Sequence, residues 1–180
     1  VDFYADHYNF PFLRYNSTNP YSGNDYLLNL TFIISRDFRF STRFRFEKTQ
    51  ERSSACITGI DLMETAVKGG SRLEINYQPN QKLRLKSRVE FSYYRGVGQS
   101  GSIGYYSGHD IGLTSNSQKY HFWMRYAMYD IPNWNNRIYA YENDVLYSFS
   151  VPAFNSKGAR FILMLKADIF RGLDVSLRYS

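Results

Sequence analysis

Two segments of this 180-residue chain carry basic side chains mostly at every second position. Residues at this spacing share one face of a strand, and cations gathered on one face raise the local concentration of anions. The chemistry predicted by this spacing is binding or selective passage of an anionic solute. The residues are Arg39, Arg43 and Arg45 in the first segment, and Lys82, Arg84, Lys86 and Arg88 in the second.

The same cations have a second interpretation that requires no solute. Carboxylates occur in neighbouring predicted strands, and ion pairs with them would simply fill the interior of the protein. Both interpretations stay open at the level of sequence. The carboxylates are Glu47, Glu74, Glu90 and Asp174.

Catalytic and metal-binding chemistry has little support in the sequence. The histidines His7, His109 and His121 are scattered, and only His109 adjoins a carboxylate, Asp110. Neighbouring residues of a strand point to opposite faces, so this pair is not arranged as a base and its orienting group. The single cysteine, Cys56, allows no internal disulfide. We therefore predict no enzyme, no catalytic residue, no metal site and no cofactor.

The elements that position the basic residues are predicted to be two-faced strands. In 37–48 and 82–94, apolar residues alternate with charged ones. Further strands are predicted at 1–5, 26–35, 71–78, 103–114, 119–129, 136–142, 145–151, 160–168 and 173–180. Aromatic residues make up 18% of the chain and favour strands. The fold class is therefore all-β, a single domain of residues 1–180 forming an antiparallel up-and-down meander of about 10–11 strands.

The connections between the predicted strands alternate between short turns and longer links. The two longest links are 7–24 and 49–70, and the latter could fold inward as a plug or lie outside as a partner contact. Successive turns of a meander lie at opposite ends, so every short turn is expected at one end. Outer-membrane β-barrels have this asymmetry, and we predict part or most of such a barrel.

The strand face that carries the apolar residues is predicted to contact lipid in that barrel, and the face that carries the basic residues is predicted to line a wet interior. Aromatic residues near strand ends, Tyr105, Tyr106, Trp134, Tyr139 and Tyr141, are expected in the interfacial girdles. A spanning helix is not predicted, because the mean hydropathy is −0.47 and no long apolar run occurs. The predicted lipid-facing residues are Phe38, Phe40, Phe44, Phe46, Leu83, Leu85, Val89 and Phe91.

A net charge of +6 also raises the possibility of nucleic-acid binding. Single-strand binders stack bases on aromatic rings that share the basic face. Here the aromatic and basic residues lie on opposite faces, so we predict that this segment contacts no nucleic acid directly.

Three stretches resemble a known family: 124–130 (MRYAMYD), 137–153 (RIYAYENDVLYSFSVPA) and 177–180 (LRYS). They are similar to the C-terminal region of Bacteroidota helix-hairpin-helix proteins, which carry competence-type helix-hairpin-helix repeats before an outer-membrane β region. The resemblance implies location in the outer membrane of a Gram-negative cell, with lipid as partner. The DNA-contacting hairpins of that family are absent from these 180 residues, so DNA binding is not carried over.

The leading hypothesis is a non-catalytic outer-membrane β-barrel segment of a Bacteroidota envelope protein, structural or transport-related, with a basic lumen. The alternative is a soluble β-sheet binding module whose basic face contacts an anionic partner, a nucleic acid or a polysaccharide. The sequence does not specify the oligomeric state. With all short turns at the periplasmic end, strand 173–180 would end on the extracellular side, one strand short of closure. An open edge is therefore expected there.

Overall fold

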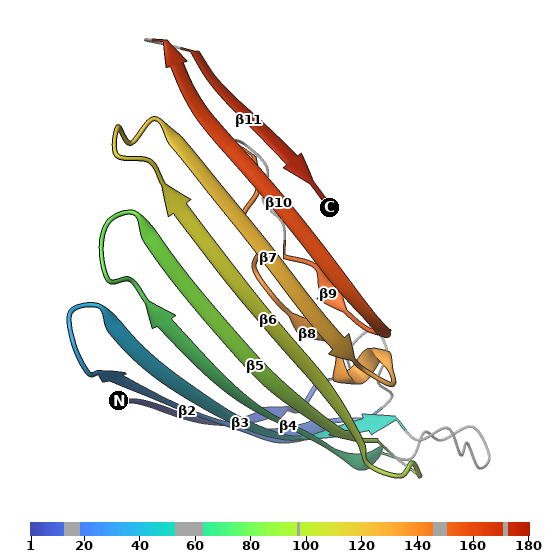
Figure 1. Cartoon of the computed structure of the whole chain (residues 1–180). Helices are drawn as coiled ribbons and strands as arrows, with labels where there is room; N and C mark the ends of the chain where they lie inside the picture. Colours follow the sequence, from blue (N-terminus) through green and yellow to red (C-terminus); the bar gives the residue numbers. More distant parts are fainter. Residues whose placement is uncertain (13–18, 53–62, 97, 146–150, 171–172) are drawn as a thin grey trace.

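The structure is a computed structural model that describes residues 1–12, 19–52, 63–96, 98–145, 151–170 and 173–180. Nine strands form one antiparallel sheet in chain order, which confirms the predicted up-and-down all-β meander (Figure 1). They are β1 (Asp2–Phe10), β2 (Tyr21–Ile33), β3 (Phe38–Arg52), β4 (Met63–Tyr77), β5 (Leu83–Arg95), β6 (Ser102–Thr114), β7 (Tyr120–Asp130), β10 (Lys157–Phe170) and β11 (Leu173–Tyr179).

Apolar residues of one strand lie opposite apolar residues of the next strand across the sheet. In the register of β2 and β3, Phe32 lies opposite Phe40, and their ring centroids are 6.0 Å apart. Phe38 lies opposite Tyr77 of β4 at 6.3 Å. Such cross-strand aromatic pairs stabilise a sheet and fix its register, because a slip of one residue would move every apolar side chain to the other face.

Short turns and long connections lie at opposite ends of the sheet, as the sequence predicts. Figure 1 shows the turns at 34–37, 78–82 and 115–119 side by side at one end, and β10 ends and β11 begins at the same end. The connections 11–20, 53–62, 96–101 and 131–156 join strands at the other end. Strands extend into both predicted long loops, since β1 ends at Phe10, β2 begins at Tyr21, β3 ends at Arg52 and β4 begins at Met63. Of the possible plug 49–70, residues 53–62, which include Cys56, lie outside the described residues, and the remainder belongs to β3 and β4.

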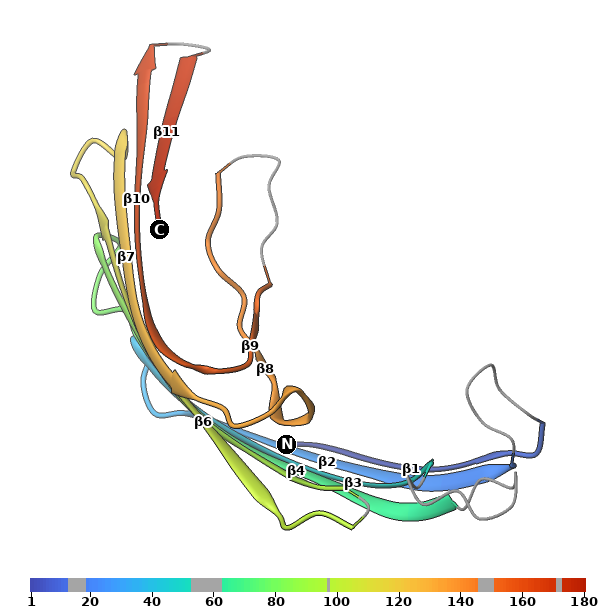
Figure 2. The same ribbon diagram turned by 90° about the vertical axis from the view of Figure 1, so that its right-hand side faces the viewer.

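The sheet is strongly curved, and one connection lies on its concave side (Figure 2). We call residues 131–145 and 151–156 the inward segment. Its described part contains the short helix η1 (Trp134–Asn136) and the paired strands β8 (Ile138–Tyr139) and β9 (Ala153–Phe154). The prediction of strand 136–142 in the meander is thus wrong, because the sheet passes from β7 directly to β10. The predicted strand 145–151 lies mostly outside the described residues.

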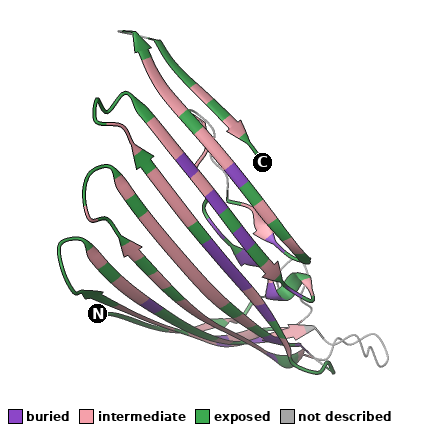
Figure 3. Cartoon of the chain, viewed as in Figure 1, coloured by how far each residue is buried: buried purple, intermediate pink, exposed green. Residues whose placement is uncertain are grey.

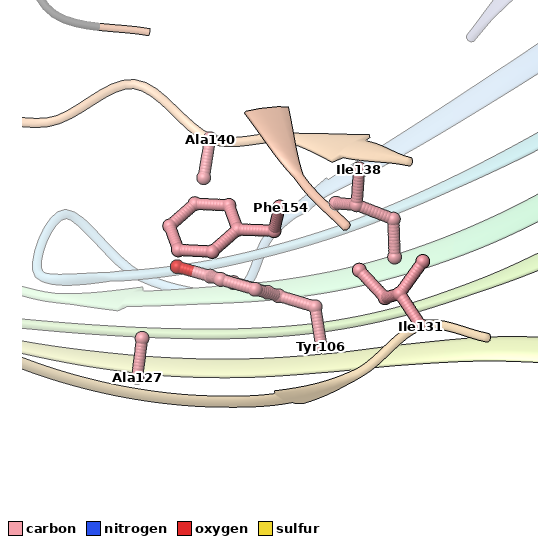
Figure 4. Packing of buried hydrophobic residues seen from close by; sticks show 6 residues of the cluster. All are labelled: Tyr106, Ala127, Ile131, Ile138, Ala140 and Phe154. Carbon is pink, nitrogen blue, oxygen red and sulfur yellow. The ribbon is translucent and has the colours of Figure 1, made fainter. Parts of the chain in front are cut away.

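A small apolar core holds the inward segment against the sheet (Figure 4). Phe154 packs on Tyr106 of β6 and Tyr129 of β7, with ring centroids 5.1 and 4.9 Å apart. The buried residues of this cluster are Tyr106, Ala127, Ile131, Ile138, Ala140 and Phe154. Figure 3 shows buried positions concentrated along β6, β7 and the middle of β10, next to this segment.

Glycines on the concave face give room for tyrosine rings in the adjacent strand. A Cβ at Gly23 would lie 2.3 Å from the Tyr8 hydroxyl, and a Cβ at Gly158 would lie 2.9 Å from the Tyr129 hydroxyl. Both glycines lie directly opposite their tyrosine in the register. The rings therefore cover backbone that no side chain shields, an arrangement known to support glycine in sheets.

Each end of the sheet is an edge among the described residues. β1 pairs with β2 alone, and β11 pairs with β10 alone, so the described sheet does not close on itself. The open edge expected at 173–180 is therefore present in β11.

Candidate functional site

The inward segment identifies which side chains belong to the concave face. Arg88 of β5 donates from Nη2 to the carbonyl of Tyr139 at 2.8 Å. Arg125 of β7 donates from Nη1 to the carbonyl of Tyr141 at 2.5 Å. The strand register then assigns all other residues of the same parity to this face.

Six of the seven predicted basic residues share the concave face. Lys82 is the exception, because it lies in the turn before β5. The six extend from the short-turn end of the sheet to the inward segment. They are Arg39, Arg43 and Arg45 of β3, and Arg84, Lys86 and Arg88 of β5.

Three of these six cations form the ion pairs of the second interpretation. Arg45 Nη2 lies 2.7 Å from Asp25 and 3.5 Å from Glu47. Lys86 Nζ lies 3.0 Å from Glu74. Arg88 pairs with Glu90, which also binds Arg72 at 2.7 Å.

Arg39, Arg43 and Arg84 form no ion pair with any described carboxylate. Arg43 donates from Nε to the side-chain oxygen of Asn29 at 2.7 Å. Asp174, the remaining predicted partner, lies 3.7 Å from Lys166. Half of these six cations are therefore paired with described carboxylates and half are not.

Beneath the inward segment the charges are buried and fully paired. Arg125 binds Asp110 through two hydrogen bonds of 2.5 and 2.6 Å, and its guanidinium lies over the Trp123 ring. This bidentate geometry is the strongest that a guanidinium and a carboxylate form. The sequence analysis did not identify this pair, although Asp110 and Arg125 belong to consecutive strands and lie on the same face.

Glu142 of the inward segment is a carboxylate with no exposed surface. Arg160 of β10 lies 3.0 Å from it, and Arg178 of β11 lies 2.9 Å from it. Arg178 also binds Asp144 at 2.6 Å. These pairs connect the inward segment to the last two strands of the sheet.

Asn136 fixes the other end of the inward segment. Its side chain donates to the carbonyls of Ser92 and Ser102 at 3.2 and 3.0 Å, and accepts from the Ser102 hydroxyl at 2.7 Å. Gly104 leaves the space that Asn136 occupies, since a Cβ there would lie 3.3 Å from the Asn136 Cβ. In the sequence, the run Asn133-Trp134-Asn135-Asn136, with Pro132 before it, is a signal against a strand at this position.

The convex face carries exposed apolar side chains across the whole sheet. All eight predicted lipid-facing residues have its parity, and Phe44 and Phe91 are 47% and 45% exposed. Large exposed apolar side chains lie on this face in each of the nine strands. One from each strand is Phe3, Phe32, Phe44, Leu73, Phe91, Leu113, Met128, Phe161 and Leu177.

Most of the residues expected in aromatic girdles lie elsewhere. Tyr106 is 1% exposed, on the concave face under Phe154. Trp134, Tyr139 and Tyr141 belong to the inward segment. Trp134, Tyr139 and Tyr141 differ from the expectation because their segment is not part of the wall, and Tyr106 differs because it has the concave parity of β6. Tyr105 has the convex parity, 5.9 Å from Phe91.

The histidines take part in separate small clusters. His109 is on the convex face, with its two ring nitrogens 3.0 and 3.1 Å from the Ser87 and Ser107 hydroxyls. Its neighbour Asp110 points to the other face and binds Arg125, as the strand geometry predicts. No described carboxylate therefore orients His109 in the manner of a hydrolytic triad.

Among the described residues, no group of three potential metal-ligating side chains comes together. The described part of the chain contains no helix with the length and apolarity needed to cross a membrane.

Comparison with known proteins returned no matching family model, curated protein or solved structure.

Proposed function

We propose that this chain forms part of the wall of an outer-membrane β-barrel, with its convex face in lipid and its concave face in a wet interior. The observation that carries the proposal is the separation of the two faces. Exposed apolar side chains lie on the convex face of all nine strands, whereas the ion-pair networks lie on the concave face. A soluble monomer rarely exposes a contiguous apolar patch above about 300–600 Å².

Strand length supports the same proposal. The central strands β2 to β7 and β10 contain 11 to 15 residues each. A tilted strand needs about 9–11 residues to cross the hydrocarbon layer. These strands are therefore long enough to span it, with their ends in the interfacial regions.

The cluster around His109 is compatible with apolar surroundings. Both ring nitrogens have a serine partner, so no nitrogen of the ring loses its hydrogen bonds in lipid. In the proposed barrel, the β1 and β11 edges are both covered, because an unpaired edge in lipid costs several kcal/mol per group.

Within this proposal the chain is non-catalytic and structural or transport-related, and the resemblance noted above supports a Bacteroidota envelope protein. The inward segment narrows the interior, and the unpaired arginines leave it basic. The competing function is a soluble binding module. It would require a second layer over the convex face, and the described residues provide none.

Bilayer quenching of tryptophan fluorescence tests the orientation of the faces. Neither native tryptophan has the convex parity: Trp123 lies opposite Gly112 on the concave face, and Trp134 belongs to the inward segment. In vesicles of brominated lipid, F44W should add a strongly quenched component and R43W should add none. Equal quenching of both variants, or a monodisperse soluble monomer without detergent, would overturn the proposal.

The free energy of unfolding in vesicles gives a second test of the orientation of the faces. Phe44→Arg should lower the free energy of unfolding in vesicles by about 2–4 kcal/mol if the residue lies near the bilayer midplane. Arg43→Ser, one residue away on the wet face, should cost far less. Equal tolerance of the two substitutions would contradict the assignment.

A further inference from the structure

A hollow of about 370 Å³ lies between strands β2 to β5 and the inward segment. This volume is within the range of small-molecule sites. Its cations come from both sides, with Arg43, Arg45, Lys68 and Arg72 from the sheet and Arg137 from the inward segment. Among the described residues, the carboxylates that line it are Glu47 and Glu90.

Ion pairs satisfy three of the five cations of the hollow. Arg45 binds Asp25 and Glu47, and Arg72 binds Glu90. Lys68 lies 3.0 Å from Glu51. Two guanidinium groups, Arg43 and Arg137, are left without an ion pair to any described carboxylate.

Arg43 is placed opposite a second cation. In the register of β3 and β4 it faces Arg72 directly. Like charges at directly opposed positions destabilise a sheet, and Glu90 binds only the Arg72 side of this pair. An anion in the hollow beside Arg43 would remove that repulsion.

Arg137 is held in one position by groups that do not neutralise it. Its Nε donates to the Tyr139 hydroxyl at 2.7 Å, and its Nη1 donates to the carbonyl of Trp134 at 3.1 Å. The guanidinium also lies over the Trp134 and Tyr139 rings, at 4.8 and 5.7 Å from their centroids. A guanidinium fixed in this way loses little freedom when it binds an oxyanion.

We propose that this hollow binds a small phosphorylated solute of about the size of a sugar phosphate, with Arg43 and Arg137 as the groups that bind its phosphate. Planar guanidinium groups match phosphate oxygens in bidentate geometry. The exposed Tyr139 ring, which also lines the hollow, offers an apolar surface for the rest of the solute. The proposal rests on the proposed function only in taking the concave face to be wet.

Isothermal titration calorimetry of the folded full chain with glucose 1-phosphate tests the site. We expect saturable binding, weaker at higher ionic strength, with unphosphorylated glucose giving none. Arg43→Gln and Arg137→Gln should each raise the Kd by about ten- to hundredfold, the usual effect of losing a hydrogen bond to a charged group. Arg137→Lys should recover part of the affinity.

The matched control is Arg84→Gln. Arg84 is another concave-face arginine without a described ion pair, and it lines a different hollow near the short-turn end. Its substitution should change the Kd less than twofold. No binding by the parent chain, or an equal loss in Arg84→Gln, would overturn the proposal, the latter by reducing the site to a general positive field.

Circular dichroism of each variant separates loss of the site from loss of the fold. Binding is measured in whatever medium keeps the chain folded, so its outcome is independent of the bilayer tests. A soluble chain that binds glucose 1-phosphate would refute the barrel and support the site. Quenching of F44W in a chain that does not bind glucose 1-phosphate would support the barrel and refute the site.

Discussion

Two regions of the concave face differ in how far their charged side chains are buried and in whether these side chains form ion pairs. Under the inward segment, Arg125 and Asp110 have side chains that are 8% and 11% exposed and bind each other in bidentate geometry. Over β2 to β5, the Arg45 side chain is 52% exposed, and Arg43 forms no ion pair with any described carboxylate. Burial explains the difference, since a charge taken out of water must be paired, whereas a hydrated one can remain available for a ligand.

Breaking a buried pair should have the largest effect. Arg125→Met leaves Asp110 and the Tyr141 carbonyl without their donor, and we expect a loss of about 3–5 kcal/mol in the free energy of unfolding. Guanidinium unfolding of the full chain measures it. Arg125→Met combined with Asp110→Leu should recover part of the loss, and an unrecovered loss would mean that packing, not charge, dominates this region.

Removing the polar anchor of the inward segment should have an intermediate effect. Asn136→Ala removes three hydrogen bonds that the buried Asn136 side chain makes with Ser92 and Ser102, so we expect a loss of about 2 kcal/mol. The same unfolding measurement applies. Asn135→Ala, at the exposed neighbouring position, is the control and should stay within about 0.5 kcal/mol. Equal losses in both variants would show that Asn136 is no anchor.

The smallest effect is expected in the open region. Arg84→Ser removes a cation that no described carboxylate binds, so stability should change by less than about 0.5 kcal/mol. A loss comparable to that of Arg125→Met in the same unfolding measurement would mean that the two regions do not differ as described.

The sheet could be predicted from sequence because its signal is local. Alternation in 82–94 identifies β5 and its faces without knowledge of any partner, and the turn residues around it set its limits. The same signal misled at 136–142, where Ile138 and Ala140 alternate with Arg137, Tyr139 and Tyr141. These residues pack against the sheet and do not join it as a strand. Tertiary contacts such as those of Asn136 determine this position.

The candidate site was half predictable for a similar reason. The spacing of Arg43 and Arg45 places them on one face, but the sequence does not show which of them has a carboxylate within reach. Register decides this, since Arg43 faces Arg72 while Arg45 is near Asp25 and Glu47. Arg137 could not be found, because it comes from the segment whose position was mispredicted.

The pairing of β7 with β10 around residues 131–156 sets the order in which the protein can fold. Every other pair of neighbouring strands in the sheet is closed by a connection of ten residues or fewer between the element ends. Closing this longer connection costs about 1 kcal/mol more in chain entropy than closing one of ten residues. Successive hairpins from β1 to β7 involve only nearby contacts and form early. We therefore expect the inward segment to dock late, on a curved wall that already exists, and to determine the slowest step of refolding.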